Sequence, residues 1–143
     1  MNKTVLVVED DKKVFDMINT IVEQYGDVVH ERAVDGAIGA LKEYCSFDLL
    51  IVDLKIIAQG LTSDQMVEYR DMEGYAFLNE FYWKTAKDDQ ERRHLEETTI
   101  ICSRYKAAFE KKYPSMSKKL ILISKDTGFV GKLKTQIKKI LNE

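Results

Sequence analysis

Proline, cysteine and long hydrophobic runs are scarce in this sequence of 143 residues. It has one proline, seven glycines and two cysteines, which excludes collagen-like and disulfide-rich chains. Cys45 and Cys102 lie far apart without a Cys-x-x-Cys spacing, so no structural zinc site is expected. The longest apolar runs span four residues, far short of the roughly 20 that a membrane helix needs. With 45% apolar and 32% charged residues, the composition predicts one globular domain over residues 1–143.

The start of the chain predicts the compartment of the protein, and its charge distribution predicts a surface for partner proteins. The chain begins Met-Asn-Lys-Thr and enters a strand-like run at once, so no signal peptide is expected, and a reduced, cytoplasmic protein is the simplest interpretation. The net charge of −2 combines −10 over residues 1–100 with +8 over residues 101–143. The region from the fourth strand to the last helix is basic in balance, and it is our hypothesis for a protein-docking face. No groove-reading motif accompanies it, so nucleic-acid binding is not expected. The short apolar runs likewise predict no association with a membrane.

Short apolar runs alternate with amphipathic stretches along the chain. The runs predict strands over 4–8, 28–33, 47–52, 98–102 and 120–123. Apolar residues at helical spacing predict helices over 14–25, 37–44, 75–83, 104–113 and 129–141. Gly26 and Pro114 are expected to end the first and fourth helices. This alternation predicts an α/β protein with a doubly wound, five-stranded parallel sheet.

Two segments stand outside this alternation. Residues 57–72 separate the third strand from its helix and contain Thr62-Ser-Asp-Gln65, a candidate capping box. The polar residues 84–97 are interpreted as an extension of the third helix followed by a loop.

Carboxylates follow two of the expected strands, Glu9-Asp-Asp11 the first and Asp53 the third. In a parallel sheet of this kind, the carboxyl ends of the strands meet at one edge. Like charges brought together repel, and a hard divalent cation such as Mg²⁺ relieves that repulsion. Asp11 is interpreted as a helix N-cap rather than a ligand.

A hydroxyl and an ammonium are expected at the same edge, because Ser103 follows the fourth strand and Lys125 the fifth. This set suits phosphoryl transfer. Asp53 would be the nucleophile, the metal and Lys125 would neutralise the phosphoryl oxygens, and Ser103 would donate a hydrogen bond.

The residues around these positions resemble a known family, the receiver domain of two-component response regulators. The resemblance covers about three quarters of the chain, in the stretches VLVVEDD (5–11), AVDGAIGAL (33–41), FDLLIVD (47–53), GYAFL (74–78) and ILISK (121–125). It implies a flavodoxin-like, CheY-like (βα)5 fold. It also implies that the protein accepts a phosphoryl group from a sensor histidine kinase or a phosphotransfer protein. The phosphorylated protein would then signal by contacting a downstream protein partner.

The family's site residues map onto this sequence one by one. By the resemblance, Glu9 and Asp10 form the acidic pair, with Asp10 a direct Mg²⁺ ligand, and Asp53 is the phosphoacceptor. The backbone carbonyl of Lys55 is a further ligand. Ser103 is the switch hydroxyl and Lys125 the lysine that reaches the phosphoryl group, and their separation of 22 residues is usual for the family.

Other positions depart from the family. Asp53 and Gly74 are 21 residues apart, so that about 13 residues within 57–72 are extra, and they would leave the sheet at the rim of the acidic pocket as a lid or partner surface. Leu122 stands where an aromatic switch residue is expected, and Asp126 replaces the proline after the lysine. Arg104 replaces the small residue after the switch hydroxyl, where it could gate the pocket or bind the phosphoryl group.

Three functions follow from these observations. The first is a phosphorylatable receiver that catalyses nothing beyond its own phosphorylation and hydrolysis. The alternative is a pseudo-receiver, which would act as a constitutive interaction module. The third, a metal-dependent phosphatase or nuclease, is disfavoured because Lys55 stands where an Asp-x-Asp motif would need its second acid.

Overall fold

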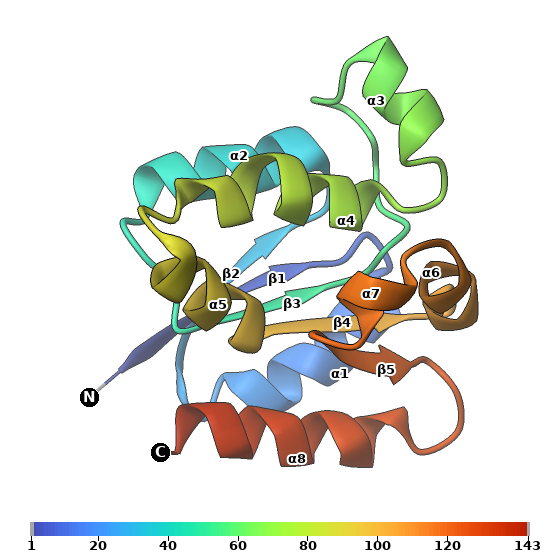
Figure 1. Cartoon of the computed structure of the whole chain (residues 1–143). Coiled ribbons are helices and arrows are strands. Elements are labelled where there is room, and N and C mark those ends of the chain that lie inside the picture. Colours follow the sequence, from blue (N-terminus) through green and yellow to red (C-terminus); the bar gives the residue numbers. More distant parts are fainter. Residues whose placement is uncertain (1, 143) are drawn as a thin grey trace.

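The computed structural model describes residues 2–142 and contains one sheet of five parallel strands (Figure 1). The strand order is β2-β1-β3-β4-β5. Their bounds are β1 (Lys3–Val8), β2 (Gly26–Glu31), β3 (Leu49–Val52), β4 (Thr99–Ser103) and β5 (Ile121–Ser124). The order reverses direction at β1, as in flavodoxin-like sheets. The predicted doubly wound α/β class is therefore confirmed.

Helices cover both faces of the sheet (Figure 1). Below it in this view lie α1 (Lys12–Val22) and α8 (Phe129–Leu141). The other face carries α2 (Val34–Glu43), α4 (Glu73–Phe77), α5 (Asp89–Glu97) and α6 (Lys106–Lys112). Three shorter pieces continue neighbouring helices, namely a π turn η1 (Leu78–Tyr82), a 3-10 turn η2 (Trp83–Thr85) and α7 (Pro114–Ser117). No helix within residues 2–142 is long and apolar enough to cross a bilayer.

Alternate residues of the central strands enter two separate cores. One set packs with α1 and α8 (Val5, Val7, Leu49 and Ile51). The other packs with α2 and α4 (Leu6, Val8, Leu50 and Val52). All eight side chains are at most 1% exposed. Because both faces are covered, β1 and β3 are continuously apolar rather than alternating.

Several boundaries differ from the sequence predictions for identifiable reasons. The first helix ends at Val22, and Gly26 begins β2 instead of ending the helix. A Cβ at Gly26 would lie 2.1 Å from the Lys3 carbonyl oxygen, so this glycine serves the close approach of β2 to β1. Pro114 does more than end a helix, since it opens α7 as an N-terminal helical residue.

Residues 84–97 hold a separate helix, so the prediction of a helix extension and loop is wrong in part. The third helix ends with η2, and α5 then begins after Asp88, whose Oδ1 accepts a hydrogen bond from the Glu91 N–H. This segment contains only two apolar residues, Ala86 and Leu95, which left too weak a periodicity to reveal the helix.

The segment 57–72 runs beside the start of α2 before it reaches the short helix α3 (Ser63–Glu68). Its Ile57 and Gln59 carbonyls accept hydrogen bonds from the Val34 and Asp35 N–H groups, at 3.0 and 2.7 Å. These carbonyls satisfy the free N–H groups at the α2 N-terminus, for which no side-chain cap is present. The predicted capping box is confirmed, since the Thr62 and Gln65 side chains each accept from the other's N–H.

Candidate functional site

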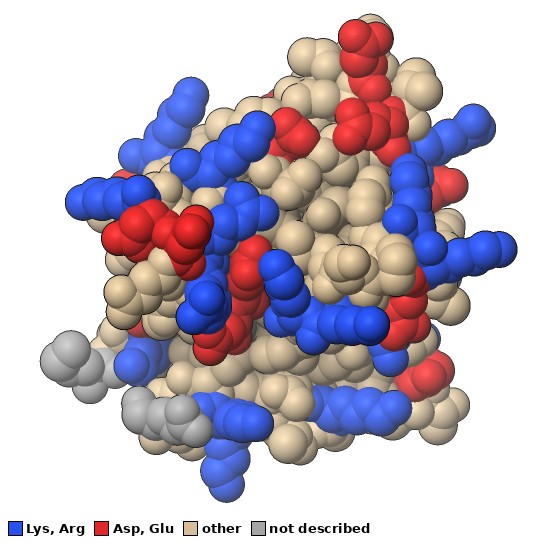
Figure 2. All heavy atoms as spheres, viewed as in Figure 1, with Lys and Arg blue, Asp and Glu red and all other residues tan. Residues whose placement is uncertain are grey.

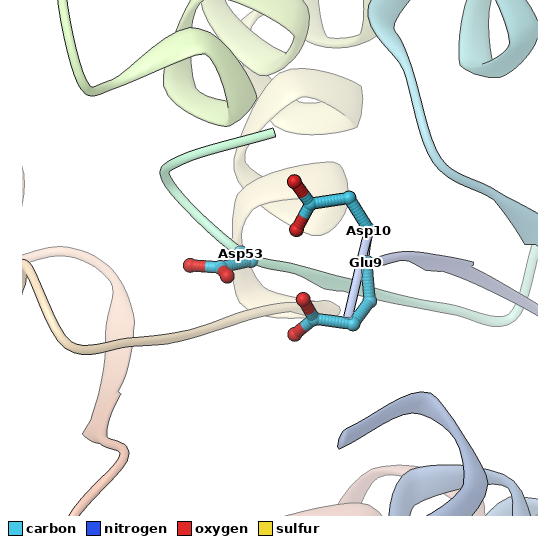
Figure 3. A group of neighbouring side chains, drawn as sticks. All are labelled: Glu9, Asp10 and Asp53. Carbon is cyan, nitrogen blue, oxygen red and sulfur yellow. The ribbon is translucent and has the colours of Figure 1, made fainter. Parts of the chain in front are cut away.

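The carboxylates of Glu9, Asp10 and Asp53 converge at the carboxyl ends of β1 and β3 (Figure 3). One oxygen from each lies within 4.8 Å of the others. The position follows from the register, because Val8 pairs with Val52 and the two strands therefore end side by side. Glu9 is 2% exposed and Asp53 is 8% exposed, so two of the three acids are largely removed from water.

Lys125 joins this group from the end of β5. Its Nζ lies 2.6 Å from Glu9 Oε1 and 2.7 Å from Asp53 Oδ2, and its side chain is 7% exposed. A buried charge is costly unless it is paired and hydrogen-bonded, and Lys125 meets both conditions. The β5 residue Ser124 pairs with Ser103 of β4, which brings the end of β5 to this edge.

Burial and mutual charge shift the proton affinities of the site. Loss of solvation and the neighbouring negative charge of Asp53 raise the pKa of Glu9 to about 7. The hydrogen bond and the positive charge of Lys125 lower this pKa, but by less. Burial alone would lower the pKa of Lys125. The charges and hydrogen bonds of Asp53 and Glu9 outweigh it and raise that pKa, so the ammonium stays charged.

The donor set fits a hard divalent cation. Asp53 Oδ1 is buried and has no hydrogen-bond partner within residues 2–142. A buried polar atom is normally satisfied, and a carboxylate oxygen beside two further carboxylates is the environment that Mg²⁺ or a similar ion takes. The acidic cluster is therefore compatible with a divalent metal.

The pocket above these acids has a volume of about 310 Å³. The acidic floor is joined at its rim by Asp11, Lys55, Arg104 and Tyr105. Asp11 is the N-cap of α1, as predicted, and accepts from the Lys13 and Val14 N–H groups. The Lys55 ammonium pairs at 3.1 Å with Asp71, near the end of the segment 57–72. No residue of that segment lines the pocket, so it does not cover it as a lid in this structure.

Ser103 is the one predicted side chain that does not line the pocket. It is 0% exposed at the end of β4, and its Oγ accepts a hydrogen bond of 3.1 Å from the Tyr105 N–H. Leu122 lies half-buried in β5, and the peptide after Lys125 is trans, as are all others in the part of the chain that the structure describes.

Two residues that sequence reasoning missed hold the acidic turn from the β2 side. His30 Nε2 lies 2.7 Å from the Glu9 carbonyl oxygen, and Arg32 Nη2 donates to the Asp10 carbonyl at 2.9 Å. The His30 ring also stacks on Phe15 of α1, with 3.6 Å between ring centroids. Their role depends on the pairing of β2 with β1, which no local pattern in the sequence reveals.

No protein-family model and no curated protein sequence matches this chain. Its fold does match solved structures. A sensor protein from Polaromonas sp. JS666 is 15% identical with a TM-score of 0.66, over 99% of this chain and 98% of that one. The Mn²⁺-bound response regulator Rcp1 is 13% identical with a TM-score of 0.65, over 97% and 94%. The PhyR response regulator REC domain of Erythrobacter litoralis is 17% identical with a TM-score of 0.62, over 99% and 91%.

These matches establish the fold. The chain has the three-layered α/β fold of response-regulator receiver domains over nearly its whole length, as the resemblance implied. The acidic cluster occupies the carboxyl edge of the sheet, where ligands bind in doubly wound folds.

Proposed function

We propose that this chain is a receiver module that accepts a phosphoryl group on Asp53. The observation that carries the proposal is the environment of this carboxylate. Oδ2 is held by Lys125 at 2.7 Å, while the buried Oδ1 has no partner among residues 2–142. One Asp53 oxygen lies within 4.8 Å of oxygens of Glu9 and Asp10, which follow β1. A nucleophile next to a fixed cation and a candidate metal site is the arrangement that phosphoryl transfer needs.

Each residue of the site has a separate role in the proposed phosphoryl transfer. Asp53 supplies the attacking oxygen, and Lys125 neutralises charge on the phosphoryl oxygens. Glu9 positions Lys125 through its 2.6 Å contact. Glu9, Asp10, Asp53 and the backbone carbonyl of Lys55 would hold Mg²⁺. When bound, the metal supplies positive charge that stabilises the transferring phosphoryl group.

The proposed role includes partners and a compartment. The phosphoryl donor is a sensor histidine kinase or a phosphotransfer protein, and the chain catalyses nothing beyond its own phosphorylation and hydrolysis. A cytoplasmic location suits this role and the two free cysteines, Cys45 and Cys102. For a downstream protein, we favour the basic side of the molecule, where Figure 2 shows basic side chains along α8, all of them lysines.

The test is intact-mass analysis after incubation with acetyl phosphate and Mg²⁺. Wild type is expected to gain one phosphoryl mass, and Asp53→Asn none, because the amide has nearly the same shape but is not a nucleophile. Omission of Mg²⁺ with EDTA present is the matched control and should abolish the gain.

Other outcomes point to the other functions. An equal gain in Asp53→Asn would place the acceptor elsewhere. No gain and no Mg²⁺ binding in wild type would reject the proposal in favour of a phosphorylation-independent pseudo-receiver. Mg²⁺-dependent turnover of a phosphomonoester would favour a phosphatase instead.

A further inference from the structure

The turn after β4 presents Arg104 and Tyr105, but not Ser103, to the acidic pocket. The hydroxyl that sequence reasoning assigned to the phosphoryl group is 0% exposed. Its Oγ accepts from the Tyr105 N–H at 3.1 Å, which closes the turn between β4 and α6. The hydroxyl thus stabilises the turn, and the side chain that follows it projects into the pocket instead.

Arg104 is the cation of the pocket that has no ion-pair partner within residues 2–142. Three cations line it, and two are already paired, Lys125 with both Glu9 and Asp53 and Lys55 with Asp71 at 3.1 Å. Within residues 2–142, Arg104 forms no ion pair, and its side chain is exposed.

Arg104 lies at the same pocket as the acidic turn. It lines this pocket together with Glu9, Asp10, Asp11 and Asp53. The Arg104 side chain is therefore positioned to interact with an anion bound above Asp53.

Phosphorylation places such an anion in the pocket. With acetyl phosphate as donor, a bond forms between an Asp53 oxygen and phosphorus as the bond from phosphorus to the acetate oxygen breaks. Acetate leaves with that electron pair, and no proton is exchanged. The Asp53 side chain changes from a monoanion to an acyl phosphate with two negative charges. A planar guanidinium matches two phosphoryl oxygens at once, which an ammonium does not.

We propose that Arg104, and not the hydroxyl of Ser103, is the side chain at the end of β4 that binds the phosphoryl group on Asp53. The inference rests on the proposed function, because it requires Asp53 to accept a phosphoryl group. It makes Arg104 a catalytic residue of the transfer and leaves Ser103 a structural one.

The experiment compares four variants of the full chain with wild type: Arg104→Ala, Arg104→Lys, Ser103→Ala and Lys106→Ala. Lys106 is the charge-matched control, since it lies two residues further on and does not line the pocket. Two quantities are measured, the rate of phosphorylation by acetyl phosphate with Mg²⁺ and the dissociation constant of beryllofluoride with Mg²⁺. Mg²⁺ affinity without an anion is measured separately.

Arg104→Ala is expected to lower the phosphorylation rate about 10- to 100-fold and to weaken beryllofluoride binding about 10-fold. The loss of rate is smaller than the roughly 100- to 1,000-fold found for a buried preorganised donor, because Arg104 is exposed. Arg104→Lys should lose less than Arg104→Ala, because lysine keeps the positive charge but lacks the planar guanidinium that donates to two oxygens at once. Lys106→Ala should stay within about 2-fold of wild type. Ser103→Ala should lose less than Arg104→Ala, because it removes a hydrogen bond within the turn and no contact with the phosphoryl group. Mg²⁺ affinity should be unchanged in Arg104→Ala, which a merely unfolded or distorted site would not allow.

The opposite pattern would overturn the inference. It is wrong if Ser103→Ala loses phosphorylation while Arg104→Ala retains it, or if Lys106→Ala loses as much as Arg104→Ala. In both cases wild type is still phosphorylated, so the proposed function stands. A wild type that neither gains a phosphoryl group nor binds beryllofluoride rejects both.

Discussion

At the scale of single residues, Lys125 organises the site. It is buried between two acids that would otherwise repel each other across the ends of β1 and β3. Removing one member of a buried charge cluster leaves the others unpaired, and this usually costs more than the intact cluster contributes. The same ammonium thus stabilises the folded site in addition to its role in the proposed phosphoryl transfer.

Lys125→Met should lower the free energy of unfolding at pH 7 by about 3 kcal/mol, because Glu9 and Asp53 lose their shared cation. Added Mg²⁺ should restore part of this loss, since it binds the folded acids and not the unfolded chain. Urea unfolding with and without Mg²⁺ measures both effects.

Lys134→Met is the control, because Lys134 is exposed on α8 and forms no ion pair within residues 2–142. It should change stability by less than about 0.5 kcal/mol. Equal stability of the two variants would mean that Lys125 contributes nothing to the acidic cluster.

At the scale of elements, the start of α4 sets the position of Asp53. The Gly74 N–H donates to the Leu54 carbonyl at 2.7 Å, so the helix begins directly against the end of β3. A Cβ on residue 74 would lie 1.9 Å from the Asp53 carbonyl oxygen and 2.9 Å from Val52 Cγ1. Only glycine allows this approach without displacing the backbone of Asp53.

Gly74→Ala should therefore destabilise the fold by about 3 kcal/mol and weaken divalent-metal binding, because the added methyl group pushes on buried backbone. Gly131→Ala makes the same chemical change where a Cβ meets nothing within 4 Å, near the start of α8. It should stabilise the protein by about 0.5 kcal/mol. Thermal unfolding and metal titration of both variants test this, and similar behaviour of the two would contradict the close approach at Gly74.

At the scale of the whole molecule, the segment 57–72 is part of the larger core. Its Leu61, Tyr69 and Met72 are buried there, although α3 itself buries none of its residues and projects from the body of the domain (Figure 1). Tyr69 anchors the segment, since its hydroxyl donates to Glu80 Oε2 at 2.5 Å and accepts from Asn79 Nδ2 at 3.1 Å. On the other side, Lys112 of α6 donates to the Glu68 carbonyl at 2.7 Å.

The bond between Tyr69 and Glu80 predicts a pH dependence of stability. The Tyr69 hydroxyl lowers the pKa of Glu80 below its ordinary value of 4.5, against the opposing effect of burial. Because the folded-state pKa is the lower one, the stabilisation is present above about pH 4.5 and is lost as the pH falls through the folded-state pKa.

Tyr69→Phe should lower the free energy of unfolding by about 1 to 2 kcal/mol at pH 7, the usual size for a bond to a charged group. The difference from wild type should shrink as the pH is lowered from 5 towards 3. Urea unfolding at several pH values measures it, and a difference independent of pH would show that the loss is one of packing alone.

The sequence by itself determined the layers of the fold and the acids of the site. Strands buried on both faces are apolar throughout, and helices show one apolar stripe, so both are visible in local patterns. Glu9, Asp10, Asp53 and Lys125 directly follow such strands, and in a parallel sheet the strand ends meet at one edge. The flavodoxin-like topology of the sheet was implied by the resemblance, and the strand order itself came from the structure.

Only the tertiary structure decided which side chains face the pocket. Ser103 and Arg104 are adjacent in the chain, yet Arg104 lines the pocket while the Ser103 hydroxyl accepts a hydrogen bond from the Tyr105 N–H. His30 and Arg32 contact the acidic turn only because β2 pairs with β1. The carbonyls of Ile57 and Gln59 cap α2 for a similar reason. Such contacts join residues distant in sequence or depend on the geometry of one turn, and neither leaves a periodic pattern that a sequence can display.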